Sequence, residues 1–121
     1  MTRILVVDDE QNIRALYEAE LGDEGYEVVT AASAKEAYDK LEKEVFDIVI
    51  LDIRMPEEDG ISALEKMMVK RRDLTVIINS AYSSYKDNFL TWLAEDYIIK
   101  SADLTELKTK IAQIVGKKGK A

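Results

Sequence analysis

The residues of this sequence that could do chemistry together are acidic, hydroxyl and ammonium groups that follow short aliphatic runs: Asp8, Asp9, Asp52, Ser80 and Lys100. Two carboxylates held about 4 Å apart repel by roughly 4 kcal/mol at an effective dielectric constant near 20. A cluster of the three acids therefore requires either protonation or a bound cation. The chain contains no His and no Cys, so a metal here must be a hard cation held by oxygen. Mg²⁺ fits best, because it takes few carboxylates and keeps positions open for water and phosphate oxygens.

The remaining two residues indicate what such a metal site would do. The ammonium group of Lys100 is a mobile point charge suited to a phosphoryl oxygen, and Ser80 offers a hydroxyl donor. A carboxylate nucleophile at Asp52, a divalent metal, an ammonium and a hydroxyl are the components of phosphoryl transfer to an aspartate. Each residue taken singly is more typical of an ordinary loop, so the hypothesis depends on their joint placement.

Five aliphatic runs and five stretches of helical spacing must position these residues. We expect strands near residues 4–7, 27–30, 46–52, 75–78 and 97–99, and helices near residues 11–22, 34–41, 61–68, 84–94 and 104–114. Alternating strands and helices predict a parallel sheet covered on both faces. Because the crossovers are right-handed, the carboxyl ends of all strands lie at one edge of the sheet. The candidate residues therefore converge on that edge.

Length and composition limit the classes of protein that remain. The 121 residues, 47% of them hydrophobic, suit a single domain spanning residues 1–121, with residues 116–121 as a flexible basic tail. The net charge of −7 argues against direct nucleic-acid binding, which needs a basic face. The absence of Cys and His excludes disulfides, thiol catalysis and Cys/His zinc sites. Since no apolar run approaches about 20 residues, we expect no membrane span and a cytoplasmic location.

The motifs resemble those of the response-regulator receiver domain, the CheY-like family of two-component signalling. The resemblance covers residues 4 to about 115 and rests on Ile4–Glu10, on Ile50–Pro56 with the Asp59-Gly60 turn, and on the spacing of Ser80 and Lys100. It implies an α/β fold: a flavodoxin-like, doubly wound, five-stranded parallel sheet with strand order 2-1-3-4-5 and five helices.

The resemblance also implies a function. Asp52 would accept a phosphoryl group from the phosphohistidine of a sensor kinase or phosphotransfer protein. Asp9 and Asp52 would hold Mg²⁺ together with the backbone carbonyl of Arg54, while Asp8 would contribute through water. Such a chain assists its own phosphorylation and dephosphorylation and is not an enzyme that turns over an external substrate.

Further residues are assigned roles in switching by the same resemblance. Ser80 and Lys100 would grip the phosphoryl oxygens, and Tyr97 would turn inward. The surface formed by the fourth helix, fifth strand and fifth helix would then be re-formed for a downstream protein, a covalently linked output domain, or a second copy in a homodimer. Arg54 and Tyr82 would flank the path of the attacking water, and we expect bulky Tyr82 to prolong the phosphorylated state.

The sequence departs from the usual receiver pattern at Ser101, which stands where a proline in a cis peptide is common. A trans Lys100–Ser101 bond is expected, because a cis bond before a non-proline residue costs about 2.5–4 kcal/mol. Bulky Phe89 and Trp92 occupy the expected fourth helix, where small residues are commoner. These departures concern the output surface and leave the acidic site unchanged.

Competing functions can be weighed from the same residues. A degenerate receiver that binds proteins without phosphorylation remains an alternative. A haloacid-dehalogenase-type phosphatase would need a general acid where this chain has Arg54, and a nucleotide- or flavin-binding domain would need a glycine-rich loop well before Gly22. A histidine phosphotransfer protein would need His. The start at Met1 suits a natural amino terminus, yet a single-domain regulator and a receiver excised from a longer protein both stay open, as do the kinase and the pathway.

Overall fold

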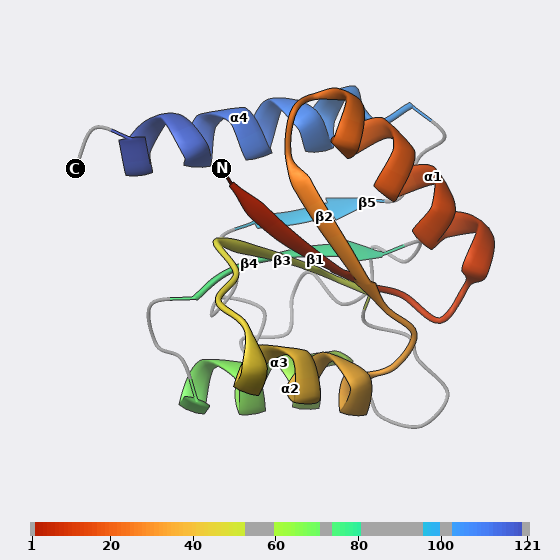
Figure 1. Cartoon of the computed structure of the whole chain (residues 1–121), viewed down its shortest axis with the longest axis vertical. Coiled ribbons are helices and arrows are strands. Elements are labelled where there is room, and N and C mark those ends of the chain that lie inside the picture. The colour runs from red at the N-terminus through yellow and green to blue at the C-terminus, as the bar shows by residue number, and fades with distance from the viewer. Residues whose placement is uncertain (1, 53–59, 71–73, 81–95, 100–102, 120–121) are drawn as a thin grey trace.

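The computed structural model describes residues 2–52, 60–70, 74–80, 96–99 and 103–119. Five parallel strands form one sheet in the order β2-β1-β3-β4-β5 (Figure 1), which confirms the expected strand order. The strands are β1 (Arg3–Val7), β2 (Glu27–Ala31), β3 (Ile48–Leu51), β4 (Thr75–Ser80) and β5 (Asp96–Ile99). The described helices are α1 (Gln11–Asp23), α2 (Ala34–Lys43), α3 (Gly60–Lys70) and α4 (Thr105–Gly119).

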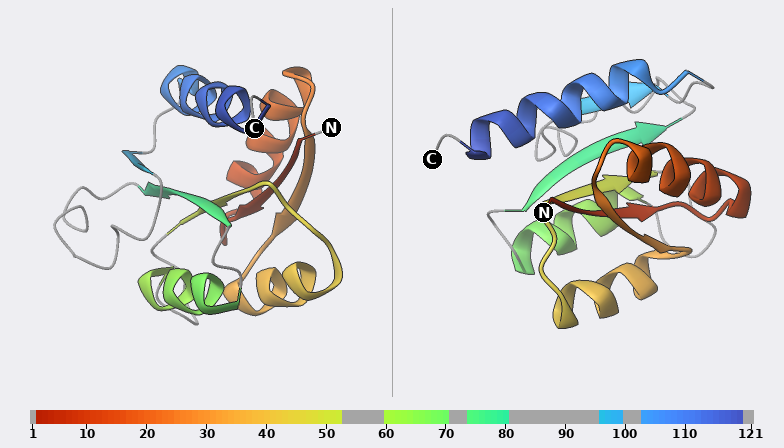
Figure 2. Two further views of the ribbon diagram at one scale, coloured as in Figure 1. Left: turned by 90° about the vertical axis from the view of Figure 1, so that its left-hand side faces the viewer. Right: turned by 45° about the horizontal axis from the view of Figure 1, so that its top comes forward.

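Helices cover both faces of the sheet, as Figures 1 and 2 show: α1 and α4 lie on one face, and α2 and α3 lie on the other. Side chains alternate between the two faces along a strand. In β1, Ile4 and Val6 accordingly join the apolar cluster under α1 and α4, whereas Leu5 and Val7 join the cluster under α2 and α3. The two clusters together form the core.

The central strand β3 has four consecutive buried residues, Ile48–Leu51. It pairs with β1 on one side and β4 on the other, with Leu51 opposite both Val7 and Ile78. A parallel strand covered on both faces needs apolar side chains at every position, which explains the unbroken aliphatic run. Asp52 comes directly after this strand and is thereby brought to the carboxyl edge of the sheet.

Side-chain caps fix the starts of two helices. The Ser33 hydroxyl accepts a hydrogen bond from the Glu36 backbone N–H at 3.2 Å, as the Ser-x-x-Glu spacing predicts. Asp103 accepts from the Thr105 backbone N–H at 2.9 Å and from the Thr105 hydroxyl. These two hydrogen bonds lower the pKa of Asp103, and the bond from the hydroxyl has the larger effect. At pH values above the ordinary carboxyl pKa, the cap therefore stabilises the folded chain. This contribution is lost as the pH falls through the lowered pKa of Asp103.

At the amino ends of the strands, Arg3 at the start of β1 makes several contacts. Its guanidinium donates hydrogen bonds to the carboxylates of Glu44 and Glu27, and these bonds, the one to Glu44 most, raise the pKa of Arg3. The same group lies 4.8 Å from the centre of the Phe46 ring. Asp47 accepts from the Arg3 backbone N–H at 2.8 Å. Arg3 thus links β1 to the segments that enter β2 and β3, far from the acidic edge.

Two boundaries differ from those expected. β4 runs to Ser80 instead of ending near residue 78, because the pairing with β5 continues through Ser80 and Ile99. α4 continues to Gly119, whereas a tail was expected from residue 116. Residues 116–119 are therefore part of the helix. The helix expected near residues 84–94 lies outside the described residues. None of the described helices is long and apolar enough to cross a membrane.

Candidate metal and phosphoryl site

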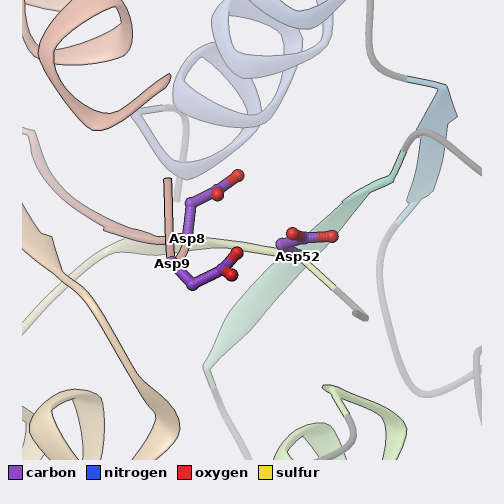
Figure 3. A group of neighbouring side chains, drawn as sticks. All are labelled: Asp8, Asp9 and Asp52. Atoms are coloured by element: carbon purple, nitrogen blue, oxygen red, sulfur yellow. The ribbon is translucent and has the colours of Figure 1, made fainter. Parts of the chain in front are cut away.

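Three carboxylates meet at the carboxyl edge of the sheet, where β1 and β3 end. The closest oxygens of Asp8, Asp9 and Asp52 all lie within 4.8 Å of one another, and Figure 3 shows the three side chains clustered there. Asp8 and Asp52 are only 3% and 5% exposed, whereas Asp9 is exposed. Two of the three carboxylates are thus buried, and the third gives the cluster access to solvent.

The sheet itself positions the two buried acids. The backbone N–H of Asp8 donates to the carbonyl of Ala31 at 3.1 Å, and that of Asp52 donates to the carbonyl of Val7 at 3.0 Å. Each bond extends the pairing of parallel strands by one residue beyond the strand itself. Asp8 and Asp52 are therefore fixed by the rigid sheet, which is the more precise way to place a functional side chain.

Helix α1 adds two further hydrogen bonds around Asp8. The side chain of Asp8 accepts from the backbone N–H of Glu10 at 2.9 Å, in the turn that leads into the helix. Arg14, in the first turn of α1, donates from Nη1 to the backbone carbonyl of Asp8 at 2.8 Å. Helix α1 is in this way tied to the end of β1, a link that the sequence did not reveal.

The donor set fits a hard divalent cation. All three groups are carboxylates, their oxygens are close enough to share one ion, and Mg²⁺ and Ca²⁺ both prefer oxygen ligands. Three negative charges gathered in a partly buried site repel one another, so a bound cation would relieve an unfavourable interaction. The cluster can therefore hold a metal and offer Asp52 as a nucleophile beside it.

The other predicted site residues are placed only in part. Ser80 is the last residue of β4 and pairs with Ile99, so its backbone reaches the same edge as Asp52. Tyr97 lies in β5 opposite Ile78. The three remaining site residues, Arg54, Tyr82 and Lys100, lie outside the described residues. The Lys100–Ser101 peptide bond and the aromatic residues of the expected fourth helix lie outside them as well. Their roles stay predictions.

One pair of buried polar residues was missed by reasoning from the sequence. Asn79 lies one residue beyond the strand expected at residues 75–78, yet it is 3% exposed and its Nδ2 donates to the hydroxyl of Tyr17 in α1. Tyr17 is itself buried, with 2% of its surface exposed. One sequence feature could have pointed to Asn79. It directly follows the aliphatic residues 75–78, just as Asp52 directly follows Ile48–Leu51.

Comparisons with known proteins agree with this arrangement. A sequence profile of the response regulator receiver domain matches residues 4–112. The response regulator ArlR of Staphylococcus aureus is 34% identical over 116 residues, which are 95% of this chain and 53% of ArlR. The chain thus spans about half the length of the curated relatives it matches.

Solved structures resemble the chain over nearly its full length. The response regulator TrrA of Thermotoga maritima, solved in complex with Mg²⁺–BeF, is 43% identical, with a TM-score of 0.91 over 94% of this chain and 99% of that one. TrrA has also been solved with the histidine kinase ThkA, with a TM-score of 0.89 over 94% of this chain and 98% of that one. A CheY-like receiver domain of Methanospirillum hungatei is 31% identical, with a TM-score of 0.91 over 100% and 99% of the two chains.

Proposed function

The chain belongs to the family of response regulator receiver domains, and on this basis we propose that it is a phosphorylation-activated receiver whose phosphoacceptor is Asp52. The observation that carries the proposal is the cluster of Asp8, Asp9 and Asp52, whose oxygens lie within 4.8 Å of one another at the carboxyl edge of the sheet. The phosphoryl donor is the phosphohistidine of a sensor kinase or phosphotransfer protein. The complex of TrrA with the histidine kinase ThkA supports a kinase as partner.

In the proposed reaction a carboxylate oxygen of Asp52 attacks phosphorus and forms a P–O bond. The P–N bond of the phosphohistidine breaks, and the imidazole nitrogen keeps the electron pair and takes up a proton. Water later attacks the acyl phosphate, which releases inorganic phosphate and restores the carboxylate. The chain promotes both steps on itself, so it is proposed as a phosphoacceptor and not as a turnover enzyme for an external substrate.

Asp9 and Asp52 would hold Mg²⁺ directly with the backbone carbonyl of Arg54, and Asp8 would contribute through water. The Mg²⁺–BeF complex of TrrA and the fit of this donor set to a hard cation support Mg²⁺. When bound, Mg²⁺ supplies positive charge that offsets the negative charge of the carboxylates and of the phosphoryl oxygens. The chain's own contribution is to fix Asp52 through its bond to Val7, so that the nucleophile is already aligned.

Ser80 and Lys100 are proposed to bind the phosphoryl oxygens. Tyr97 is proposed to turn inward when the phosphoryl group is bound. The output surface would consist of the segment 84–94, β5 and α4, and would bind a downstream protein, a linked output domain or a second copy of the chain. The net charge of −7 disfavours direct binding to nucleic acid.

Phosphoramidate tests this function directly, because its P–N bond resembles that of phosphohistidine. With Mg²⁺, the wild-type chain should convert phosphoramidate to inorganic phosphate well above the protein-free rate, as followed by ³¹P NMR. Chelation of Mg²⁺ should return the rate to the protein-free value. Consumption at the protein-free rate under all conditions would favour the alternative, a degenerate receiver that binds proteins without phosphorylation.

Replacing Tyr82 with Ala should shorten the lifetime of the phosphorylated state. Tyr82 lies two residues beyond Ser80, where its bulk would obstruct the attacking water, so Tyr82→Ala is expected to accelerate dephosphorylation several-fold. Loss of the adduct after removal of the donor, followed by intact mass, measures this rate. Tyr38→Ala, on helix α2, is the matched control. Equal lifetimes in wild type and Tyr82→Ala would show that Tyr82 does not obstruct the water.

A further inference from the structure

Asn79 stands out among the buried residues. Within the part of the chain whose side chains the structure describes, the buried polar residues are Asp8, Asp52 and Asn79. Two of these are the proposed metal and phosphoryl ligands, which explains their burial. The third has no role in the proposed reaction, although burying an amide is unfavourable unless a hydrogen bond compensates.

The pairing of the strands places Asn79 next to the phosphoacceptor. Leu51 of β3 lies opposite Ile78 of β4, so Asp52 and Asn79 are the next residues along the two neighbouring strands. Leu51 and Ile78 both face α2 and α3. Since side chains alternate between faces, the next position on each strand belongs to the face of α1 and α4. Asn79 therefore occupies the same row of the sheet as Asp52, one strand away.

A hydrogen bond from Asn79 to Tyr17 ties this row to helix α1. The amide of Asn79 donates from Nδ2 to the Tyr17 hydroxyl, and Tyr17 is 2% exposed. Arg14, three residues earlier and on the same side of the helix, donates to the backbone carbonyl of Asp8. Helix α1 thus bonds to the ends of two strands on either side of β3, which carries Asp52.

Asn79 borders a cavity and is therefore not enclosed by close packing on every side. Beside it lies a cavity of about 360 Å³, whose lining includes Tyr17, Asn79, Ile98 and Leu104. An amide with open space on one side can rotate, unlike a side chain that is enclosed in a close-packed core. The hydrogen bond to Tyr17 therefore favours one orientation of the Asn79 side chain.

We infer that Tyr17 and Asn79 are positioning residues for phosphoryl transfer, because their hydrogen bond fixes the carboxyl end of β4 relative to Asp52. Ser80, the proposed phosphoryl-binding residue, is the next residue on that strand, so a shift of Asn79 is passed on directly through the backbone. This inference rests on the proposed function. It adds two residues that touch neither the metal nor the phosphoryl group and act through the placement of Ser80.

The test compares the variants Tyr17→Phe and Asn79→Leu with the double variant that carries both. Each single variant removes one partner of the hydrogen bond, whereas the double variant replaces both partners with apolar groups of similar shape, which is often nearly neutral for stability. The rate constant for phosphoryl uptake from acetyl phosphate with Mg²⁺, the Mg²⁺ affinity and the urea midpoint are measured for all four proteins. Tyr26→Phe is the matched control, because Tyr26 packs against the same apolar cluster from the far end of the sheet.

Both single variants and the double variant should take up phosphoryl about fivefold more slowly than wild type, because a displaced Ser80 forms a weaker hydrogen bond to the phosphoryl group in the transition state. The Mg²⁺ affinity should stay at the wild-type value, and the double variant should recover the wild-type urea midpoint without recovering the rate. Tyr26→Phe should keep the wild-type rate.

Two results would overturn the inference. A double variant that regains the wild-type rate together with its stability would show that the pair only satisfies polar groups in the core. Single variants with unchanged rates would show that Ser80 is placed without the pair. Failure of the proposed function itself is distinguishable, because the wild-type chain would then take up no phosphoryl group at all.

Discussion

Asp52→Asn is expected to make the fold more stable than wild type when divalent cations are removed. The oxygens of Asp8, Asp9 and Asp52 lie within 4.8 Å of one another, and two of these residues are buried. Two unit charges at that separation repel by roughly 3 kcal/mol at an effective dielectric constant near 20. Because Asp9 is exposed and its repulsion is screened by solvent, we expect a gain of about 1–3 kcal/mol in the free energy of unfolding, measured by urea unfolding in chelator.

Adding Mg²⁺ should reverse this order. A cation that binds only the folded state stabilises it in proportion to the logarithm of its concentration over its dissociation constant, and Asp52→Asn lacks one of the proposed ligands. Wild type should therefore gain much more stability from Mg²⁺ than the variant. Asp39→Asn, an equal charge change at an exposed position of α2, should leave both effects unchanged. Equal stabilisation of wild type and Asp52→Asn by Mg²⁺ would contradict a metal site at this cluster.

Leu51→Ala is expected to be the most destabilising single change considered. Leu51 is fully buried in the central strand, between β1 and β4 and under α2 and α3. Truncating such a leucine removes buried apolar surface and leaves a cavity, at a cost of about 2–5 kcal/mol. Since domains of this kind have a total stability of about 5–15 kcal/mol, the variant should still fold but unfold at a much lower urea concentration.

Val69→Ala provides the matched control for this change. Val69 is 75% exposed on α3, so its truncation should change the free energy of unfolding by no more than about 0.5 kcal/mol. Similar losses for the two variants would mean that β3 does not form the centre of the core. The comparison needs no ligand and no phosphoryl donor, and therefore tests the fold separately from the function.

The central part of the fold was predictable because its signals are local. An unbroken aliphatic run such as Ile48–Leu51 indicates a strand covered on both faces, and helical spacing on either side indicates the layers that cover it. The strand order is different in kind: it came from the family resemblance, since runs of similar composition do not say which strands are neighbours. The structure confirms the order. The convergence of Asp8, Asp9 and Asp52 then follows from the parallel direction of the strands.

Asn79 shows why the rest of the site was out of reach. Whether an amide after an aliphatic run ends the strand or extends it depends on whether a partner compensates its burial. Here the partner is Tyr17, which is 62 positions away in the chain, and no local pattern records that contact. The end of α4 is a similar case, because the apolar spacing that predicts the helix stops at Ile114, whereas the helix continues to Gly119.

The most direct test of the central claim, that Asp52 is the phosphoacceptor, is the intact mass of the chain after incubation with acetyl phosphate and Mg²⁺. One phosphoryl adduct per chain is predicted for wild type, and it should disappear both in Asp52→Asn and when a chelator removes the metal. Treatment with hydroxylamine should remove the adduct, as expected for an acyl phosphate. An adduct that persists in Asp52→Asn, or no adduct on wild type while TrrA is modified in parallel, would contradict the claim.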